Sequence, residues 1–387
     1  MKNPKVYIII LNYNGWADTI ECLESVLRNN YPNYQVIVID NNSPNNSMEH
    51  IKAWAEGKLD VWVNPKHSLR HLSFPPVKKP IPFVYYTRKE AEKGGNKSLE
   101  DKLKRRISKS ITTTYPLIFI QTGENLGYAG GNNVGIKYAL EKDDCKYIWI
   151  LNNDTVIEKN SLLEMVKVID SNNRIGIVGS KLLRYDIPTT LQTLCGTTKM
   201  TWKNAGKGNY LFSNEEDKQD FNKIFELDSG YIVGASILIR KEVFEDIGLL
   251  DENYFMWAED TDFCMRAIRN GWKLYCCGKS KIWHKEGASS GSGKMKKFLW
   301  RTSIRPSFSR FIITGYLDIR NHIYFVKKHW GTFHMWIYIL GPNLKKVSRK
   351  ILGILLFDDR KLQRIKLLLK GIIDGIIGKV GKPRELP

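Results

Sequence analysis

The stretch "VYIIILNYNGWADTIECLESVLRNNYPNYQVIVID", residues 6–40, decides the fold class of this 387-residue chain. Residues 6–11 and 36–40 are β-branched apolar runs bounded by Asn, Gly and Pro, which is typical of buried strands. Between them, apolar side chains recur at helical spacing, at Trp16, Ile20, Leu23, Val26 and Leu27. This order predicts a β-α-β unit, in which two parallel strands are joined by a right-handed helical crossover.

The same alternation continues to about residue 290. Further strands are expected at 118–121, 147–151, 175–183, 231–240 and 273–278. Helical patterns separate several of them, at 130–142, 160–170 and 258–271. We therefore predict an α/β domain over residues 1–290, with a mostly parallel central sheet flanked by helices.

Two basic segments depart from this rhythm. Residues 64–115 are rich in Pro, Lys and Ser and carry a net charge of +9, so we interpret them as an inserted, partly flexible excursion. Residues 291–387 carry +16 and have helical patterns, so we expect a basic helical C-terminal region. The whole chain carries +20, so the residues outside these two segments carry a net charge of −5 and are mildly acidic.

Cysteine usage and hydropathy indicate a cytoplasmic protein. The six cysteines form no C-x-x-C pair, so we interpret them as reduced thiols without a zinc framework. The apolar run near the N-terminus is too short for a signal peptide. No uninterrupted apolar stretch reaches about 18 residues, so we expect no transmembrane helix.

The positive charge raises two possible partners. Nucleic acid is not expected, because the chain has no zinc-finger spacing, RNP signature or recognisable helix-turn-helix. Residues 361–381 combine an apolar stripe with lysines, which fits either a helix packed on the catalytic domain or an interfacial helix on an anionic membrane surface. The aromatic and basic residues 319–330 favour the membrane interpretation, under which the protein would be peripheral to the cytoplasmic face.

Polar clusters follow four of the apolar strands. They are "NYNG" at 12–15, "DNNSPNNS" at 40–47, "GENLGYAGGNN" at 123–133 and "LNND" at 151–154. Each alone could be an ordinary turn, because Asn, Asp and Gly are common turn residues. Ligands of open parallel sheets bind beyond the carboxyl ends of the strands, so the four together predict a ligand site.

Acids and a histidine in the last third of the domain carry candidate chemistry. Glu259, Asp260 and Asp262 lie close together where a helix is expected to begin, a position that the helix dipole favours for acids. Clustered carboxylates also raise one another's pKa, which suits a general base. His284 follows an aromatic strand and could be either structural or a metal ligand.

Six motifs in this order resemble those of family 2 glycosyltransferases, most closely the rhamnosyltransferase-like branch. The resemblance covers most of residues 5–290 apart from the segment 64–115. The motifs are "IIILNYNG", "VIVIDNNSPNNS", "NLGYAGGNNVGI", "YIWILNNDTVI", "GYIVGASILIRKEVFEDIGLLDENYFMWAEDTDFCMRAIRNGWKLYCC" and "HKEGASS".

The resemblance implies a GT-A fold and an inverting transfer from a nucleotide-diphosphate sugar, linked to UDP or dTDP, to a glycan or lipid-linked acceptor. By position, Asn12 and Asn14 would border the base and ribose, and Asp40 would hydrogen-bond the pyrimidine. The other residues expected to bind the donor are Asn125, Gly127, Gly131, Asn132, Asn152 and Asn153.

The resemblance also implies a divalent cation, Mg²⁺ or Mn²⁺. Asp154 matches the last position of the family's D-x-D-like metal motif, but Asn152 stands at its first position. Metal binding should therefore depend on Asp154, His284 and the donor phosphates. Asp260 would be the catalytic base, with Glu259 and Asp262 in acceptor binding or support.

Two rival functions remain open at this point. A sugar-nucleotide nucleotidyltransferase would usually carry a Gly-rich basic phosphate loop near its N-terminus, which residues 11–15 lack. A non-catalytic sugar-nucleotide or carbohydrate-binding relative would not need Asp154, Asp260 and His284 together.

Overall fold

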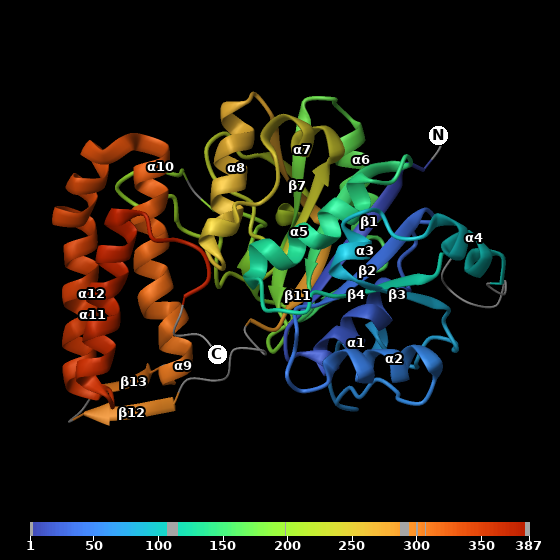
Figure 1. The fold of residues 1–387 in the computed structure, drawn as a ribbon, viewed down its shortest axis with the longest axis horizontal. Helices are drawn as coiled ribbons and strands as arrows, with labels where there is room; N and C mark the ends of the chain where they lie inside the picture. Colours follow the sequence, from blue (N-terminus) through green and yellow to red (C-terminus); the bar gives the residue numbers. More distant parts are fainter. Residues whose placement is uncertain are drawn as a thin grey trace.

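The computed structural model describes residues 3–106, 115–197, 199–286, 294–298, 301–305 and 307–383. Its core is a large mixed sheet flanked by helices, with a separate helical layer beside it (Figure 1). The strands of the main sheet are β1 (Lys5–Asn12), β2 (Tyr34–Asp40), β3 (Phe83–Thr87), β4 (Leu117–Gln121), β5 (Cys145–Asn152), β6 (Thr155–Ile157), β7 (Ile175–Arg184), β8 (Leu191–Thr193), β9 (Ile224–Glu226), β10 (Ser236–Arg240) and β11 (Lys273–His284).

The helices of the same region connect these strands. They are α1 (Trp16–Val26), α2 (Ser47–Glu56), α3 (Arg88–Ala91), α4 (Lys97–Arg106), α5 (Gly127–Leu140), α6 (Ser161–Asp170), α7 (Lys241–Ile247) and α8 (Glu259–Arg269). The predicted β-α-β unit is confirmed, since β1 and β2 are parallel and α1 joins them.

The order of the strands in the sheet indicates where a ligand would bind. Along the sheet it is β3-β4-β2-β1-β5-β10-β7-β11-β6, and the pairs from β3 to β5 are all parallel. The crossovers β1 to β2 and β4 to β5 run in opposite directions across the sheet, so right-handed connections put α1 and α5 on opposite faces. The carboxyl ends of β1 and β5 therefore lie at a topological switch point, where doubly wound sheets bind ligands.

Two expected features of the sheet differ in the structure. Residues 231–240 do not form one strand, because β10 begins only at Ser236 and the backbone N–H of Gly234 donates to Asp260 at 3.1 Å. Within residues 64–115, β3 pairs in parallel with β4 and extends the sheet at its edge. Residues 107–114 of that segment lie outside the described residues.

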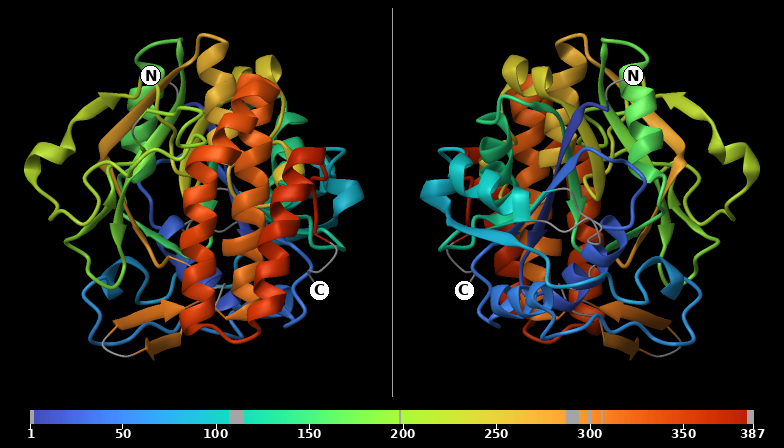
Figure 2. Two further views of the ribbon diagram at one scale, coloured as in Figure 1. Left: turned by 90° about the vertical axis from the view of Figure 1, so that its left-hand side faces the viewer. Right: turned by 90° about the vertical axis from the view of Figure 1, so that its right-hand side faces the viewer.

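The C-terminal region is helical, as expected. After the hairpin β12 (Lys294–Phe298) and β13 (Arg301–Arg305), it contains α9 (Phe308–Phe311), α10 (Asp318–Tyr338), α11 (Leu344–Phe357) and α12 (Lys361–Ile377). Helices α10, α11 and α12 stand side by side as one layer against the α8 side of the catalytic domain (Figures 1 and 2). In the part of the chain that the structure describes, no helix is both long and apolar enough to span a bilayer.

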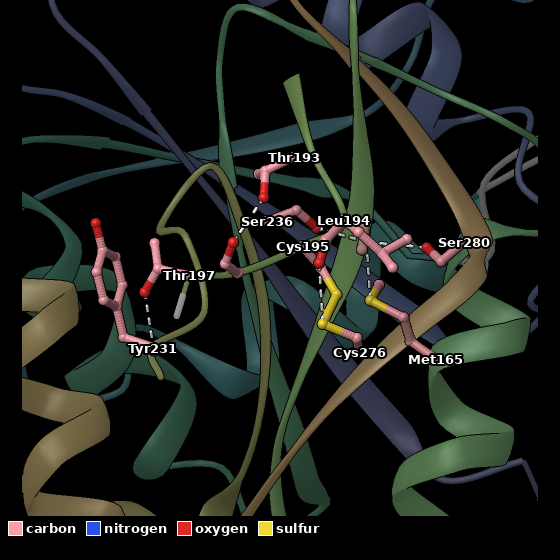
Figure 3. The surroundings of a disulfide bond; sticks show 11 residues. Met165, Thr193, Leu194, Cys195, Thr197, Tyr231, Ser236, Cys276 and Ser280 are labelled. Carbon is pink, nitrogen blue, oxygen red and sulfur yellow. Dashed lines mark hydrogen bonds between the residues drawn. A yellow bond between two sulfur atoms is a disulfide. The ribbon is translucent and has the colours of Figure 1, made fainter. Parts of the chain in front are cut away.

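The prediction that all six cysteines are reduced thiols is wrong for two of them. Cys195 and Cys276 form a disulfide, and their Cα atoms are 5.7 Å apart although 81 positions separate them in sequence (Figure 3). The loop after β8 brings Cys195 against β11, a proximity that cysteine spacing cannot reveal. Cys22, Cys145, Cys264 and Cys277 are free and buried.

Candidate active site

The carboxyl ends of β1 and β2 are joined by a buried polar network. Asn12 donates to Asp40 Oδ1 at 2.7 Å, and the Ser43 hydroxyl donates to the same oxygen at 2.5 Å. The other oxygen of Asp40 accepts the backbone N–H of Ser43 at 3.1 Å. Both Asn12 and Asp40 are fully buried, so the network holds the Asp40 carboxylate in one orientation.

Asn12 and Asn153 support the network, whereas Asn14 leaves a polar atom unused. Asn12 Oδ1 accepts from Gly15 N at 3.1 Å, and Asn153 donates to Thr19 Oγ1 at 3.0 Å. Asn14 has a positive φ of 60°, and its buried Oδ1 has no hydrogen-bond partner among the described residues. An unsatisfied buried acceptor calls for an explanation, and a ligand N–H or O–H would satisfy it.

The predicted donor residues at the start of α5 contact protein groups. Asn125 Oδ1 accepts from Gly127 N at 3.0 Å, and Asn132 donates to Tyr128 O at 2.9 Å. A Cβ on Gly127 would lie 2.2 Å from Phe255 O, and one on Gly131 would lie 2.6 Å from the side chain of Leu11. Both glycines are therefore required by close packing within the fold, which places α5 beside the strand ends.

The proposed metal residues lie together. His284 Nε2 is 3.1 Å from Asp154 Oδ1 and 3.5 Å from the amide nitrogen of Asn152, at the meeting point of β5, β6 and β11. His284 Nδ1 lies 2.9 Å from Gln192 Oε1 on β8. This contact directs Nε2 toward Asp154. In metal sites, a hydrogen-bond partner of the other ring nitrogen commonly orients the histidine in this way. Gln192 was not identified from the sequence, because nothing local marks it.

Burial and a neighbouring negative charge shift the pKa of His284 in opposite directions. Burial lowers the pKa of the imidazole, but the negative charge of Asp154 and the hydrogen bond to it outweigh burial, so the net shift is upward. Next to it, Lys285 N donates to Asp154 O at 3.0 Å. The Lys285 ammonium is held by Asp18 and Glu21, each at 2.6 Å, which fixes the end of β11. Residues 287–290, the end of the "HKEGASS" motif, lie outside the described residues.

Asp154 and His284 fit a divalent cation only together with further ligands from a bound substrate. Within the described ranges, no group of three or more His, Cys, Asp or Glu side chains is arranged to hold a metal. Asp154 and His284 supply two ligands, and Mg²⁺ and Mn²⁺ are often held by one or two side chains plus substrate phosphates. The arrangement matches the expectation that a donor diphosphate completes the site.

A cavity of about 460 Å³ opens beside the start of α8. Glu259 and Asp260 line it, and the exposed rings of Tyr210 and Trp257 stand at its wall. Its full lining is Lys207, Gly208, Asn209, Tyr210, Tyr231, Trp257, Ala258, Glu259, Asp260, Thr261 and His322. A cavity that combines acids with aromatic surfaces suits a sugar, which offers both hydroxyl groups and apolar C–H faces.

Asp260 is oriented by backbone groups. Its Oδ1 accepts from Thr261 N at 2.7 Å, and its Oδ2 accepts from Gly234 N at 3.1 Å. Burial raises the pKa of Asp260 although these hydrogen bonds lower it. Tyr231, on the neighbouring wall, is held by Thr197, whose N–H donates to Tyr231 O at 3.1 Å in the loop that the disulfide anchors (Figure 3).

Glu259 and Asp262 have different surroundings. Glu259 is buried at 5% exposure, and its Oε2 has no hydrogen-bond partner among the described residues; burial and then the charge of Asp260 raise its pKa well above the usual value. Asp262 is fully buried and is not part of the cavity wall. It binds Lys328 at 2.7 Å and His329 at 2.8 Å, both on α10. Asp262 therefore has a supporting role and connects α8 to the C-terminal layer.

Helix α10 also holds the loop that precedes Glu259. The Asn321 amide donates to Tyr254 O, Met256 O and Trp257 O at 2.8–2.9 Å. Phe255, Trp257 and Ala258 all have positive φ, a conformation that costs free energy and persists where surrounding contacts hold it. The sequence did not indicate this role of the C-terminal region.

Tyr128 connects the two halves of the site. Its hydroxyl donates to Gly234 O at 2.7 Å. Burial raises the pKa of Tyr128 well above the usual value, and the charges of Glu259, Asp260 and Asp154 raise it further. Gly234 therefore links the Tyr128 hydroxyl to Asp260, which accepts from Gly234 N at 3.1 Å, and the charge of Asp154 acts on the same phenol. Tyr128 lies within the "NLGYAGGNN" motif, but its position there gave no reason to single it out.

Comparisons with known proteins agree with this architecture. The model of glycosyl transferase family 2 matches residues 7–68 and 96–248, more than half of the chain. The low-salt glycan biosynthesis hexosyltransferase Agl10 of Haloferax volcanii is 26% identical over 278 residues, which are 69% of this chain and 78% of Agl10. The dTDP-rhamnosyl transferase RfbF of Shigella flexneri is 26% identical over 43% of this chain and 52% of its own length.

A solved structure gives a more distant likeness. The crystal structure of GalNAc-T7 with UDP, GalNAc and Mn²⁺ aligns with 97% of this chain and 56% of that chain, at a TM-score of 0.49 and 13% identity. The family assignment does not depend on this likeness. The family match over the sheet that carries Asp40, Asp154 and the β1–β5 switch point leads to one conclusion: the chain belongs to glycosyl transferase family 2 and is a glycosyltransferase of the GT-A fold.

Proposed function

We propose that this glycosyltransferase is inverting and metal-dependent, and that it moves a sugar from a nucleotide-diphosphate donor to a hydroxyl of a glycan or lipid-linked glycan. The observation that carries the proposal is that Tyr128 is hydrogen-bonded to Gly234, which also holds Asp260 in the cavity wall, while the charge of Asp154 in the Asp154–His284 pair acts on the same phenol. One side suits a diphosphate with its cation, and the other suits an acceptor sugar. The match to glycosyl transferase family 2 favours this reaction over that of a sugar-nucleotide nucleotidyltransferase.

The residues present define one chemical step. Asp260 takes the proton of the acceptor hydroxyl while that oxygen forms a bond to the anomeric carbon. The bond from this carbon to the donor phosphate breaks, and its electron pair leaves with the nucleoside diphosphate. A cation held by Asp154, His284 and the donor phosphates would neutralise the charge that develops on the leaving group. Displacement from one face inverts the anomeric carbon.

Donor recognition is proposed to rest on the β1–β2 network. Asp40 Oδ2 accepts one backbone N–H, so it retains acceptor capacity for the imide N–H of a pyrimidine. Uracil and thymine present this same N–H, which fits UDP- and dTDP-linked donors alike. RfbF is named as a dTDP-rhamnosyl transferase, and this makes dTDP-rhamnose the first donor to test.

A membrane surface is the proposed site of action. In α10 to α12 and their connections, eleven large apolar side chains are 37–75% exposed. They are Phe333, Trp336, Ile337, Leu340, Leu344, Leu352, Leu355, Leu362, Leu369, Ile373 and Ile377. We call them the apolar stripe. In the left view of Figure 2 these helices stand in front, and no other helix or strand that the structure describes lies over their outer face.

Residues 361–381 were expected either to pack on the catalytic domain or to lie on a membrane surface, and α12 packs chiefly against α10 and α11. Ile365, Ile372 and Ile376 pack in the C-terminal apolar cluster, whereas Leu362 and Ile373 remain exposed. The helix therefore packs through one face and presents another. Such a helix leaves an apolar surface that an interfacial contact would cover.

The charge around the stripe favours an anionic surface as the occupant. Of the four acids in residues 307–383, Asp318, Asp358 and Asp374 are buried, and Asp359 is bonded to Arg364. Exposed cations on and beside α12 are Arg360, Lys361, Lys366 and Lys379. Each basic residue near an anionic bilayer contributes about 1 kcal/mol. Placement on the cytoplasmic face stays a prediction from the sequence.

The test is a panel of nucleotide sugars with and without Mn²⁺, read first by thermal shift and then by release of nucleoside diphosphate. A ligand that binds only the folded chain raises the melting temperature. We expect dTDP- or UDP-linked sugars to raise it only with the cation, and slow donor hydrolysis to follow without acceptor. A panel in which no nucleotide sugar binds or is hydrolysed would refute the proposed function.

A further inference from the structure

Three lysines surround one buried carboxylate at the rim of the cavity. Asp318, 3% exposed at the start of α10, binds Lys207 Nζ at 2.6 Å, Lys346 Nζ at 2.7 Å and Lys350 Nζ at 3.0 Å. The lysines come from two segments, the loop before residue 210 and helix α11. Among the described residues, no other carboxylate is paired with any of the three. We call these lysines and Asp318 the lysine cluster.

The lysine cluster has surplus positive charge. His322 adds no charge, because burial and repulsion from Lys207 and Lys346 hold its pKa well below the usual value. Burial lowers the pKa of Lys346 to about 8, and repulsion from Lys207 and Lys350 adds to this effect although Asp318 opposes it. One carboxylate therefore faces three ammonium groups, and an additional anion would relieve their repulsion.

The lysine cluster is accessible and adjoins the cavity. Lys207 and His322 both line the cavity that contains Asp260. The side chain of Lys207 is 47% exposed, and those of Lys346 and Lys350 are each 26% exposed. A purely structural ion pair would need one lysine, whereas three partly exposed ammonium groups suit a phosphate, which takes several donors.

The geometry points to a phosphate-binding subsite for the acceptor, formed by Lys207, Lys346 and Lys350 beside the cavity that receives the acceptor hydroxyl. This inference rests on the proposed function, because it treats the cavity as the acceptor site. It specifies the acceptor further: a phosphate or diphosphate lies close to the sugar that is extended. The subsite is separate from the donor diphosphate, whose proposed ligands are Asp154 in the turn between β5 and β6 and His284 at the end of β11.

The experiment measures calorimetric binding of inorganic pyrophosphate and of geranyl diphosphate to the full chain in EDTA, where the donor site has no divalent cation. We expect both probes to bind, and Lys346→Gln/Lys350→Gln to weaken binding at least tenfold. The matched control, Lys345→Gln/Arg349→Gln, removes two exposed charges from the same helix and should stay within twofold. Unchanged affinity in the first double variant would overturn the subsite, as would absence of binding to the unmodified chain.

Two further measurements keep the result interpretable. Lys346→Arg/Lys350→Arg retains the charges and should restore binding, which separates charge from a loss of folding. Tighter binding of geranyl diphosphate than of pyrophosphate would identify a lipid-borne phosphate, and equal binding a phosphate without lipid. Failure of the nucleotide-sugar panel with intact pyrophosphate binding would refute the proposed function and leave phosphate binding by the lysine cluster without an acceptor role.

Discussion

His284 Nε2 lies 3.1 Å from Asp154 Oδ1, although 130 residues separate the two in sequence. The contact forms because Asp154 lies in the turn directly before β6, and β11 runs antiparallel beside β6. Gln192 on β8 fixes the imidazole from its other side. The proposed metal site is therefore a product of three strands.

The first prediction concerns this site. Asp154→Ala and His284→Ala should each abolish Mn²⁺-dependent binding of UDP or dTDP, because only two side chains supply ligands. Gln192→Leu should weaken it about 10- to 100-fold, since an outer partner orients the ligand. Calorimetry with nucleotide and Mn²⁺ measures this, and Gln219→Leu, an exposed glutamine, is the control. Full affinity in Asp154→Ala would contradict the metal assignment.

The second prediction concerns Asp260. Asp260→Asn should lower kcat by about 10²- to 10⁴-fold, the usual contribution of a general base, with donor affinity unchanged. Because the pKa of Asp260 is raised, activity of the unmodified enzyme should fall with decreasing pH well before an ordinary aspartate becomes protonated. Rates across pH 4–9 measure this. Asp220→Asn, an exposed acid, serves as control, and a fully active Asp260→Asn would rule out the base.

The third prediction concerns the stability cost of Glu259. Its pKa is higher in the folded than in the unfolded chain, so folding is penalised at any pH above the unfolded value near 4.3. Glu259→Gln should therefore raise the melting temperature at pH 7.5, by about 2 °C for each 1 kcal/mol recovered. At pH 4 the gain should vanish. Glu49→Gln, at an exposed site, should show no such dependence, and a lower melting temperature for Glu259→Gln at pH 7.5 would contradict the argument.

The fourth prediction concerns Asn321 on α10. Asn321→Leu removes the amide shared by three backbone carbonyls of the strained loop; Tyr254 O keeps Arg320 Nη2 at 3.1 Å and Met256 N at 2.7 Å, whereas Met256 O and Trp257 O lose the Asn321 amide. We therefore expect kcat to fall at least tenfold while affinity for the sugar donor remains. Steady-state kinetics measure kcat and the KM for the sugar donor separately. Asn343→Leu is a matched control, because Asn343 is equally buried in the same helical layer but its amide makes no hydrogen bond among the described residues. Equal effects of the two variants would refute a specific role for Asn321.

The fifth prediction concerns the apolar stripe. The chain should sediment with vesicles containing phosphatidylglycerol and much less with pure phosphatidylcholine, and salt should weaken the binding. Leu340→Ser/Leu362→Ser should reduce it severalfold, whereas Trp62→Ser, at an 81% exposed tryptophan of the catalytic domain, should not. Self-association that the stripe variant abolishes, without vesicle binding, would instead identify a second copy as the occupant.

Local pattern was enough to predict the sheet and the general place of the site. The unbroken apolar runs at 6–11 and 36–40 and the period-3.6 pattern between them determine the β-α-β unit, because a strand buried on both faces is apolar throughout and a helix buried on one side is apolar along one stripe. The polar ends of β1, β2 and β5 could be foreseen from the sequence, since parallel strands end at the same edge of a sheet.

Only the tertiary structure decided which residues meet. The Cys195–Cys276 disulfide, the contact of Gln192 with His284 and the hold of Asn321 on residues 254–257 all join distant segments. Asp262 illustrates the reason: in sequence it belongs to the acidic cluster, but in space it binds Lys328 and His329. Periodicity determines which face of an element is buried, whereas the partner of a buried polar group depends on how distant elements pack.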